Sequence, residues 1–133
     1  MDARADPEAH DRDDFRVEVI DSWPGISVVV VAGDVDLHSA PELRDELSAL
    51  VDSDTRQVTL DLSEVTFLDS MALGVILGTK KRLAASGRDL ELVVANPDIR
   101  RIFEITMLDR IFELHPSRAA AGLPDYKAAS TEG

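Results

Sequence analysis

Two stretches near the start of the chain carry the residue pattern of β-strands. Residues 15–21 alternate apolar and polar side chains, which is the pattern of a strand with one buried face. Residues 26–32 are a run of mostly β-branched apolar residues, which favours a strand buried on both faces. Pro24 and Gly25 form a turn signal between the two runs. We therefore expect an antiparallel hairpin.

Helical and extended patterns then alternate along the chain. Three segments have helical spacing, namely 41–51, 70–86 and 97–106, and three have strand spacing, namely 57–62, 90–95 and 111–114. Pro41 and Pro97 stand near the first helical positions, and Gly87 follows the end of the second helix. Strands that alternate with helices favour parallel pairing. The pattern predicts an α/β fold with a small mixed, mostly parallel sheet of four to five strands and about three helices.

The helix expected after residue 69 has two unusual sides. Its apolar stripe consists of Leu73, Ile76, Leu77, Lys80, Leu83 and Ala84, in which only Lys80 is out of keeping. Another side carries Gly74 and Gly78, each of which costs about 1 kcal/mol relative to Ala inside a helix. Two glycines on one side indicate that something approaches this backbone closely. The approaching group is either the sheet of the protein itself or a partner.

The start of the same helix carries a candidate functional serine. Asp69 is expected to cap the helix, because its carboxylate can accept a hydrogen bond from a first-turn N–H group. Ser70 is then the first helical residue, where bare N–H groups and partial positive charge would tolerate a phosphate. Asp-Ser before an apolar helix is usually no more than a cap, so the local pattern alone does not decide between the two roles.

Composition narrows the classes of function. The chain has 133 residues, of which 44% are hydrophobic, so it can bury one core. A net charge of −12 argues against binding to nucleic acid or to anionic membranes. There is no apolar run of membrane-spanning length, no apolar core of a signal peptide, and no cysteine. We expect a cytoplasmic protein with a domain at residues 15–115, between a disordered tail at 1–14 and a flexible tail at 116–133.

Few residues suggest chemistry of their own. His10, His38 and His115 are scattered without the spacing of metal ligands, so no metal or other cofactor is expected. Asp34 and Asp36 follow a strand, where ligand sites of α/β folds often form, although a solvated loop edge with a turn cap is the more common explanation for such a pair. No phosphate-binding glycine loop and no nucleophile with a base is visible. An enzyme is therefore not expected.

Four segments resemble bacterial anti-sigma factor antagonists, which are single STAS domains. Residues 67–78, with the sequence FLDSMALGVILG, look like the signature of this family. Residues 33–37 and 39–44 resemble its other marker, and residues 99–106 resemble its third-helix segment. The resemblance covers about residues 15–115 in the right order, and it implies a STAS-like domain.

The resemblance also implies a phosphorylation switch. In this family the serine that matches Ser70 is phosphorylated by the anti-sigma factor, which is a serine kinase. The unphosphorylated antagonist binds that kinase and releases the sigma factor, and a PP2C-type phosphatase resets the switch. The residues that this similarity assigns to partner binding are Asp34, Asp36, Asp69, Ser70, Met71, Gly74, Val75 and Gly78.

The chain departs from the family at three positions. Ala72 and Met107 stand where the family often has glycine, and Met71 stands where it often has a small polar residue. These departures leave the expected fold unchanged and bear on the identity of the partner. Two alternatives remain open: a STAS scaffold or accessory subunit without phosphorylation, for example in a stress-signalling assembly, and a small-ligand or nucleotide-binding domain that uses the loop at residues 34–36.

Overall fold

The structure is a computed structural model that describes residues 14–123. These residues form a five-stranded sheet with the strand order β2-β3-β4-β5-β6. The strands are β2 (Arg16–Trp23), β3 (Ile26–Val35), β4 (Gln57–Leu68), β5 (Asp89–Val93) and β6 (Leu114–His115). The helices are α2 (Ala40–Val51), α3 (Ser70–Ala84), α4 (Pro97–Ile105) and the short 3-10 helix η1 (Leu108–Arg110). The predicted α/β class and the predicted order of strands and helices are confirmed.

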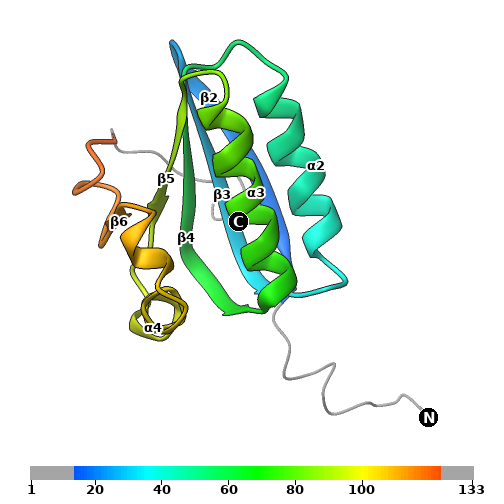
Figure 1. Cartoon of the computed structure of the whole chain (residues 1–133), viewed down its shortest axis with the longest axis vertical. Coiled ribbons are helices and arrows are strands. Elements are labelled where there is room, and N and C mark those ends of the chain that lie inside the picture. The colour runs from blue at the N-terminus through cyan, green and yellow to red at the C-terminus, as the bar shows by residue number, and fades with distance from the viewer. Residues whose placement is uncertain (1–13, 124–133) are drawn as a thin grey trace.

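The sheet is mixed, and its strands run as predicted. β2 and β3 form the expected antiparallel hairpin, whereas the pairs β3–β4, β4–β5 and β5–β6 are parallel. α2 and α3 lie side by side over one face of the sheet (Figure 1). The carboxyl ends of β3 and β4 meet at the end of the sheet where α3 begins (Figure 1). No helix in the described range of the chain is long and apolar enough to cross a bilayer.

The main core lies between the sheet and the helices. Fully buried side chains from every layer contribute to it, including Val29, Val31, Leu60, Leu62, Leu43, Leu47, Ile76, Leu83 and Phe103. The apolar stripe predicted for α2 is correct, because Leu43, Leu47 and Leu50 are all buried. In α4, Ile99 and Phe103 are buried as predicted, and Ile102 is partly buried against the same core.

The buried side of α3 differs from the predicted stripe. The residues that are fully buried are Ala72, Ile76, Thr79 and Leu83, while Leu73, Leu77 and Lys80 are only partly buried and Ala84 is exposed. Thr79 can face the core because its hydroxyl donates to the carbonyl of Val75 at 2.8 Å. Lys80 lies at the margin of the core, where its Nζ contacts Asp89 Oδ1 at 2.6 Å and lies 5.2 Å from the ring centroid of Phe112.

Strand β4 is longer than predicted. The sequence places its end at Leu62 and a loop before Asp69, but the strand continues to Leu68. The register between β3 and β4 shifts twice, between Val30 and Ala32 and between Gly33 and Asp34. Gly33 has a φ of +85°, a left-handed conformation that favours glycine. The two shifts carry both strands farther than their alternation indicates, and they bring Phe67 opposite Asp34.

The segment after α4 also differs from the prediction. The sequence predicts a strand at residues 111–114, but only Leu114–His115 pair with β5. η1 precedes this short strand, and Met107, the residue just before η1, has a φ of +62°. Met107 is therefore a non-glycine residue in the left-handed region, which costs about 1–2 kcal/mol because Cβ crowds the following carbonyl oxygen.

Replacing Met107 with Gly is therefore expected to raise the free energy of unfolding by about 0.5–1 kcal/mol, since glycine adopts this conformation without crowding. The exposed side chain loses little packing, because 58% of its surface is accessible. Urea unfolding of the variant and of Met107→Ala measures the effect. The alanine variant keeps a Cβ and should show no gain. Equal stability of all three proteins would contradict strain at this position.

The second face of the sheet is covered by residues 116–123, which we call the C-terminal strap. Leu123 packs with Val28, Val30 and Val93, which point away from the helices. Arg118 Nε donates to Asp61 Oδ2 at 2.5 Å, and the Asp61 side chain is fully buried. The strap is the beginning of the predicted C-terminal tail. The rest of that tail and residues 1–13 of the predicted N-terminal tail lie outside the described residues.

Candidate functional site

Ser70 lies where the sequence predicts it, at the first position of α3. Asp69 caps the helix, because its Oδ1 accepts a hydrogen bond from the backbone N–H of Ala72 at 3.0 Å. The Ser70 side chain is exposed, and no residue in the range 14–123 forms a hydrogen bond with its hydroxyl. The hydroxyl is therefore accessible to a second protein and is not occupied by a structural contact.

The backbone around Ser70 is fixed to the sheet. The N–H of Asp69 donates to the carbonyl of Val35 at 3.2 Å, which joins the start of α3 to the end of β3. The carbonyl of Asp69 accepts from the N–H of Leu73 at 3.1 Å, which begins the helix. Ser70 is thus held by a strand end and a helix rather than by a free loop. A partner that docks here meets a surface that is already in place.

Asp34 and Asp36 make different structural contacts. Asp34 Oδ1 accepts the hydroxyl of Thr66 at 2.7 Å, so this carboxylate ties β3 to β4. Asp36 Oδ1 accepts the backbone N–H groups of His38 at 2.9 Å and Ser39 at 3.2 Å, and so organises the loop before α2. Both side chains are partly buried, close to the start of α3. The prediction that they contact a partner remains a prediction, and each has a structural role as well.

The glycine side of α3 is open. Gly74 is exposed and Gly78 is partly exposed, and a Cβ added at either residue would meet no atom within 4 Å outside its own helix. The sheet of the protein therefore does not approach these glycines, which excludes one of the two explanations for them. Met71 is exposed on the first turn, whereas Val75 is partly buried against the core. Of these predicted contact residues, Met71 and Gly74 are the most accessible to a partner.

Sequence reasoning missed two exposed apolar residues at this end of the sheet. Leu37 is 58% exposed in the loop after β3, and Phe67 is 47% exposed near the end of β4. Met71, on the first turn of α3, is 52% exposed. Leu37 lies two residues after Val35, and Phe67 and Met71 lie two residues on either side of Asp69. The signal available in the sequence was that Leu37 belongs to no helical or strand stripe.

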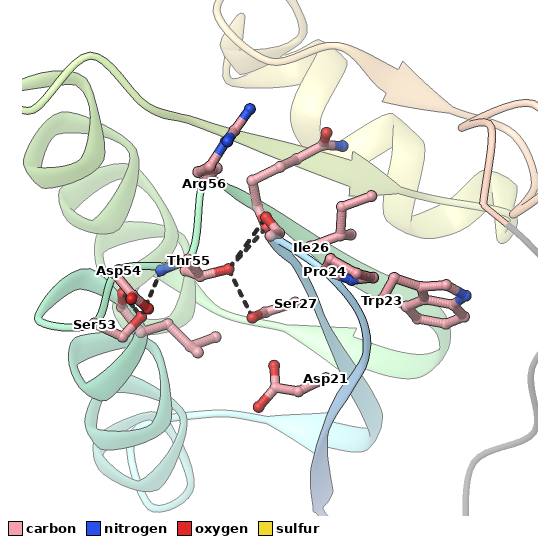
Figure 2. A pocket seen from close by; sticks show the side chains of 12 residues that line it. Asp21, Trp23, Pro24, Ile26, Ser27, Ser53, Asp54, Thr55 and Arg56 are labelled. Carbon is pink, nitrogen blue, oxygen red and sulfur yellow. Dashed lines mark hydrogen bonds between the residues drawn. The ribbon is translucent and has the colours of Figure 1, made fainter.

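A pocket of about 1100 Å³ lies at the opposite end of the sheet. The β2–β3 turn and the loop between α2 and β4 line it, so it does not include the 34–36 loop (Figure 2). Its buried hydroxyls are already paired, since Ser27 Oγ and Thr55 Oγ1 are 2.8 Å apart. Asp21 and Asp54 outnumber the single cation Arg56 in its lining. This balance of charge disfavours the phosphates of a nucleotide.

Metal-ligating side chains do not gather in the described range of the chain. No group of three or more His, Asp or Glu residues there is arranged to hold an ion. His115 lies 3.2 Å from Glu91 on the neighbouring strand, and His38 is exposed in the loop after β3. His10, the third histidine considered from the sequence, lies outside the described residues.

Comparisons with known proteins point in one direction. The family model described as STAS domain matches residues 18–121. The anti-sigma-B factor antagonist of Staphylococcus aureus is 32% identical over 87 residues, which are 65% of this chain and 81% of that protein. The crystal structure of an anti-sigma factor antagonist from Mycobacterium paratuberculosis superposes with a TM-score of 0.75 at 32% identity, covering 82% of this chain and 92% of that one.

A more distant structure has the same fold. SpoIIAA in its unphosphorylated form, an anti-sigma factor antagonist, matches with a TM-score of 0.68 at 17% identity, over 83% of this chain and 100% of that one. SpoIIAA of Bacillus in the phosphorylated form matches with a TM-score of 0.64 at 18% identity, over 80% of this chain and 97% of that one. At these identities the likeness concerns the fold, which therefore exists with and without a phosphate in that protein.

Proposed function

Because this chain belongs to the STAS domain family, we propose that it is an anti-sigma factor antagonist whose activity is switched at Ser70. The unphosphorylated chain binds an anti-sigma factor that is also a serine kinase, and the sigma factor is released. Phosphorylation of Ser70 ends this binding, and a PP2C-type phosphatase restores it. The protein acts in the cytoplasm as a regulator of transcription, through protein contacts rather than through catalysis or direct binding to nucleic acid.

The exposed hydroxyl of Ser70, free of hydrogen bonds to the described residues, is the observation that carries the proposal. A serine that served only to cap the helix would accept a backbone N–H group, but Asp69 already performs that task. The names of the Staphylococcus and Mycobacterium relatives support the antagonist class. The open glycine side of α3 supports the approach of a second protein at the same place.

A phosphate on Ser70 should leave the domain folded. It would add about −1.5 to −2 charges at the N-terminus of α3, where the helix dipole favours a nearby anion by about 0.3–1 kcal/mol. The free energy of unfolding should therefore not fall. The phosphate would act on the complex instead, because it would occupy space beside Gly74 and would lose its water when a partner covers it.

The proposal is tested by phosphate transfer. Incubated with ATP and each anti-sigma factor kinase of its source genome, the wild-type chain should gain a single phosphate from at least one of them, measured by intact mass. Ser70→Ala should gain none, because the acceptor is missing. Ser86→Ala, which removes an exposed hydroxyl beyond the far end of α3, should be phosphorylated like the wild type.

Two outcomes would contradict the proposal. No transfer from any such kinase would favour a STAS scaffold that works without phosphorylation. Transfer to Ser70→Ala at the wild-type rate would place the acceptor elsewhere in the chain.

A further inference from the structure

Building on the proposed function, we propose that Leu37, Phe67 and Met71 form an apolar ring that the kinase covers, and that the phosphate switches binding off by desolvation rather than by charge repulsion. The kinase surface that fits is an apolar platform with cations at its margin. With apolar atoms covering Ser70, a phosphate weakens binding even though the margin of the kinase surface is positively charged.

The three residues are exposed at the end of the sheet where β3 and β4 finish and α3 begins. Each lies two residues from one end of the hydrogen bond between Asp69 N–H and the Val35 carbonyl. Each also keeps about half of its surface accessible, with values of 58%, 47% and 52%. Neighbouring large apolar side chains that stay in water are a feature of surfaces that another molecule covers.

The charged residues around the ring indicate the charge of the partner surface that faces them. Residues 33–43 and 64–79 make up this end of the sheet and the start of α3. These two segments carry five carboxylates and neither lysine nor arginine; Glu64 is paired with Arg16 and Arg118, and the other carboxylates are Asp34, Asp36, Glu42 and Asp69. An acidic margin around an apolar centre is complementary to a partner with a basic margin.

Electrostatic attraction alone would make the phosphorylated chain bind more tightly, which is the opposite of the proposed switch. A phosphate on Ser70 makes this surface more negative, and a basic partner would be attracted more strongly. Binding falls if the atoms that cover Ser70 are apolar, since the phosphate then loses water and finds no donor or cation. Met71, directly after Ser70, supplies an apolar neighbour on this chain, and the platform of the kinase supplies the other side.

The first arm of the test uses the kinase that phosphorylates the chain in the transfer experiment, with ATP omitted. Leu37→Ser and Phe67→Ser should each weaken its binding to the unphosphorylated chain by about tenfold or more. Their melting temperatures should stay near that of the wild type, because the side chains are exposed. Ile105→Ser is the matched control: Ile105 is 70% exposed at the end of α4, and its loss should leave the affinity unchanged.

The second arm separates desolvation from repulsion. The ratio of affinities between unphosphorylated and phosphorylated chain should not fall from low to high salt, because salt screens charge, including any attraction of the phosphate to the basic margin, and leaves the desolvation cost in place. Met71→Ser, which gives the phosphate a polar neighbour, should reduce this ratio by about fivefold or more, the size of coupling expected of adjacent residues.

The outcomes distinguish the two proposals. If the wild-type chain does not bind the kinase, the proposed function fails. If it binds, but Leu37→Ser and Phe67→Ser bind equally well or the ratio collapses at high salt, the apolar ring is overturned while the switch at Ser70 stands.

Discussion

Replacing Ser70 with Asp is expected to weaken binding of the anti-sigma factor kinase by about 100-fold or more, while the melting temperature does not fall. The binding loss follows from placing a carboxylate where the partner covers the start of α3, because an unpaired charge that loses its water costs several kcal/mol. The stability follows from the position, since the first turn of a helix favours an anion by about 0.3–1 kcal/mol. Calorimetric titration and thermal unfolding of the same preparation measure both quantities.

Ser70→Ala provides the control for this experiment. It removes the hydroxyl without adding charge, so it should bind the kinase like the unphosphorylated wild type and remain bound when ATP is added. Full affinity of Ser70→Asp would show that this residue is not covered in the complex. A melting temperature that drops sharply in Ser70→Asp would instead show that the loss of binding comes from unfolding.

Replacing Arg118 with Met is expected to lower the free energy of unfolding by about 3 kcal/mol. The Asp61 carboxylate is fully buried, and the substitution takes away the guanidinium that lies 2.5 Å from it. A buried charge that loses its partner costs about 3–5 kcal/mol, and the value here falls at the lower end because Asp61 also accepts from the N–H and the hydroxyl of Ser63.

Urea unfolding measures the effect of Arg118→Met against that of Arg118→Lys. The lysine variant keeps the positive charge on a shorter side chain, so its decrease in the free energy of unfolding should be less than half as large. If Arg118→Met is as stable as the wild type, the contact between the strap and the sheet contributes nothing in solution. This result would leave the site at Ser70 untouched, because the strap covers the face of the sheet away from the helices.

The features that the sequence predicted well are decided by neighbouring residues. Asp69 caps α3, because a short polar side chain before a helix accepts an N–H three residues later. The hairpin of β2 and β3 follows from one alternating run, one fully apolar run and the turn at Gly25, whose φ is +76°. The position of Ser70 was predicted for the same reason, since the cap fixes where the helix begins.

The features that the sequence missed depend on residues that are far apart in the chain. The extension of β4 to Leu68 depends on irregular pairing with β3 around Gly33, which the alternation of β4 alone does not contain. The strap depends on Arg118 reaching Asp61, a residue 57 positions earlier. The buried side of α3 was displaced in the prediction because Thr79 looks polar until its hydroxyl is paired with a carbonyl of its own helix.

The candidate site was only partly predictable for a related reason. A serine after a capping aspartate is visible in the sequence, whereas exposure is not. An apolar residue is expected in the core, so the sequence does not mark Leu37 and Phe67 as exposed residues. In the structure they are 58% and 47% exposed. The space beside Gly74 is likewise visible only in the structure, because a sequence does not show which neighbour approaches a glycine.

The most direct test of the account compares one chain in two states. Wild-type protein, purified before and after complete phosphorylation at Ser70, is titrated into its anti-sigma factor kinase with the sigma factor already bound. The account predicts that the unphosphorylated chain displaces the sigma factor and that the phosphorylated chain requires at least about 100-fold higher concentration to do so, which corresponds to about 2.7 kcal/mol. Equal displacement by both states would contradict it.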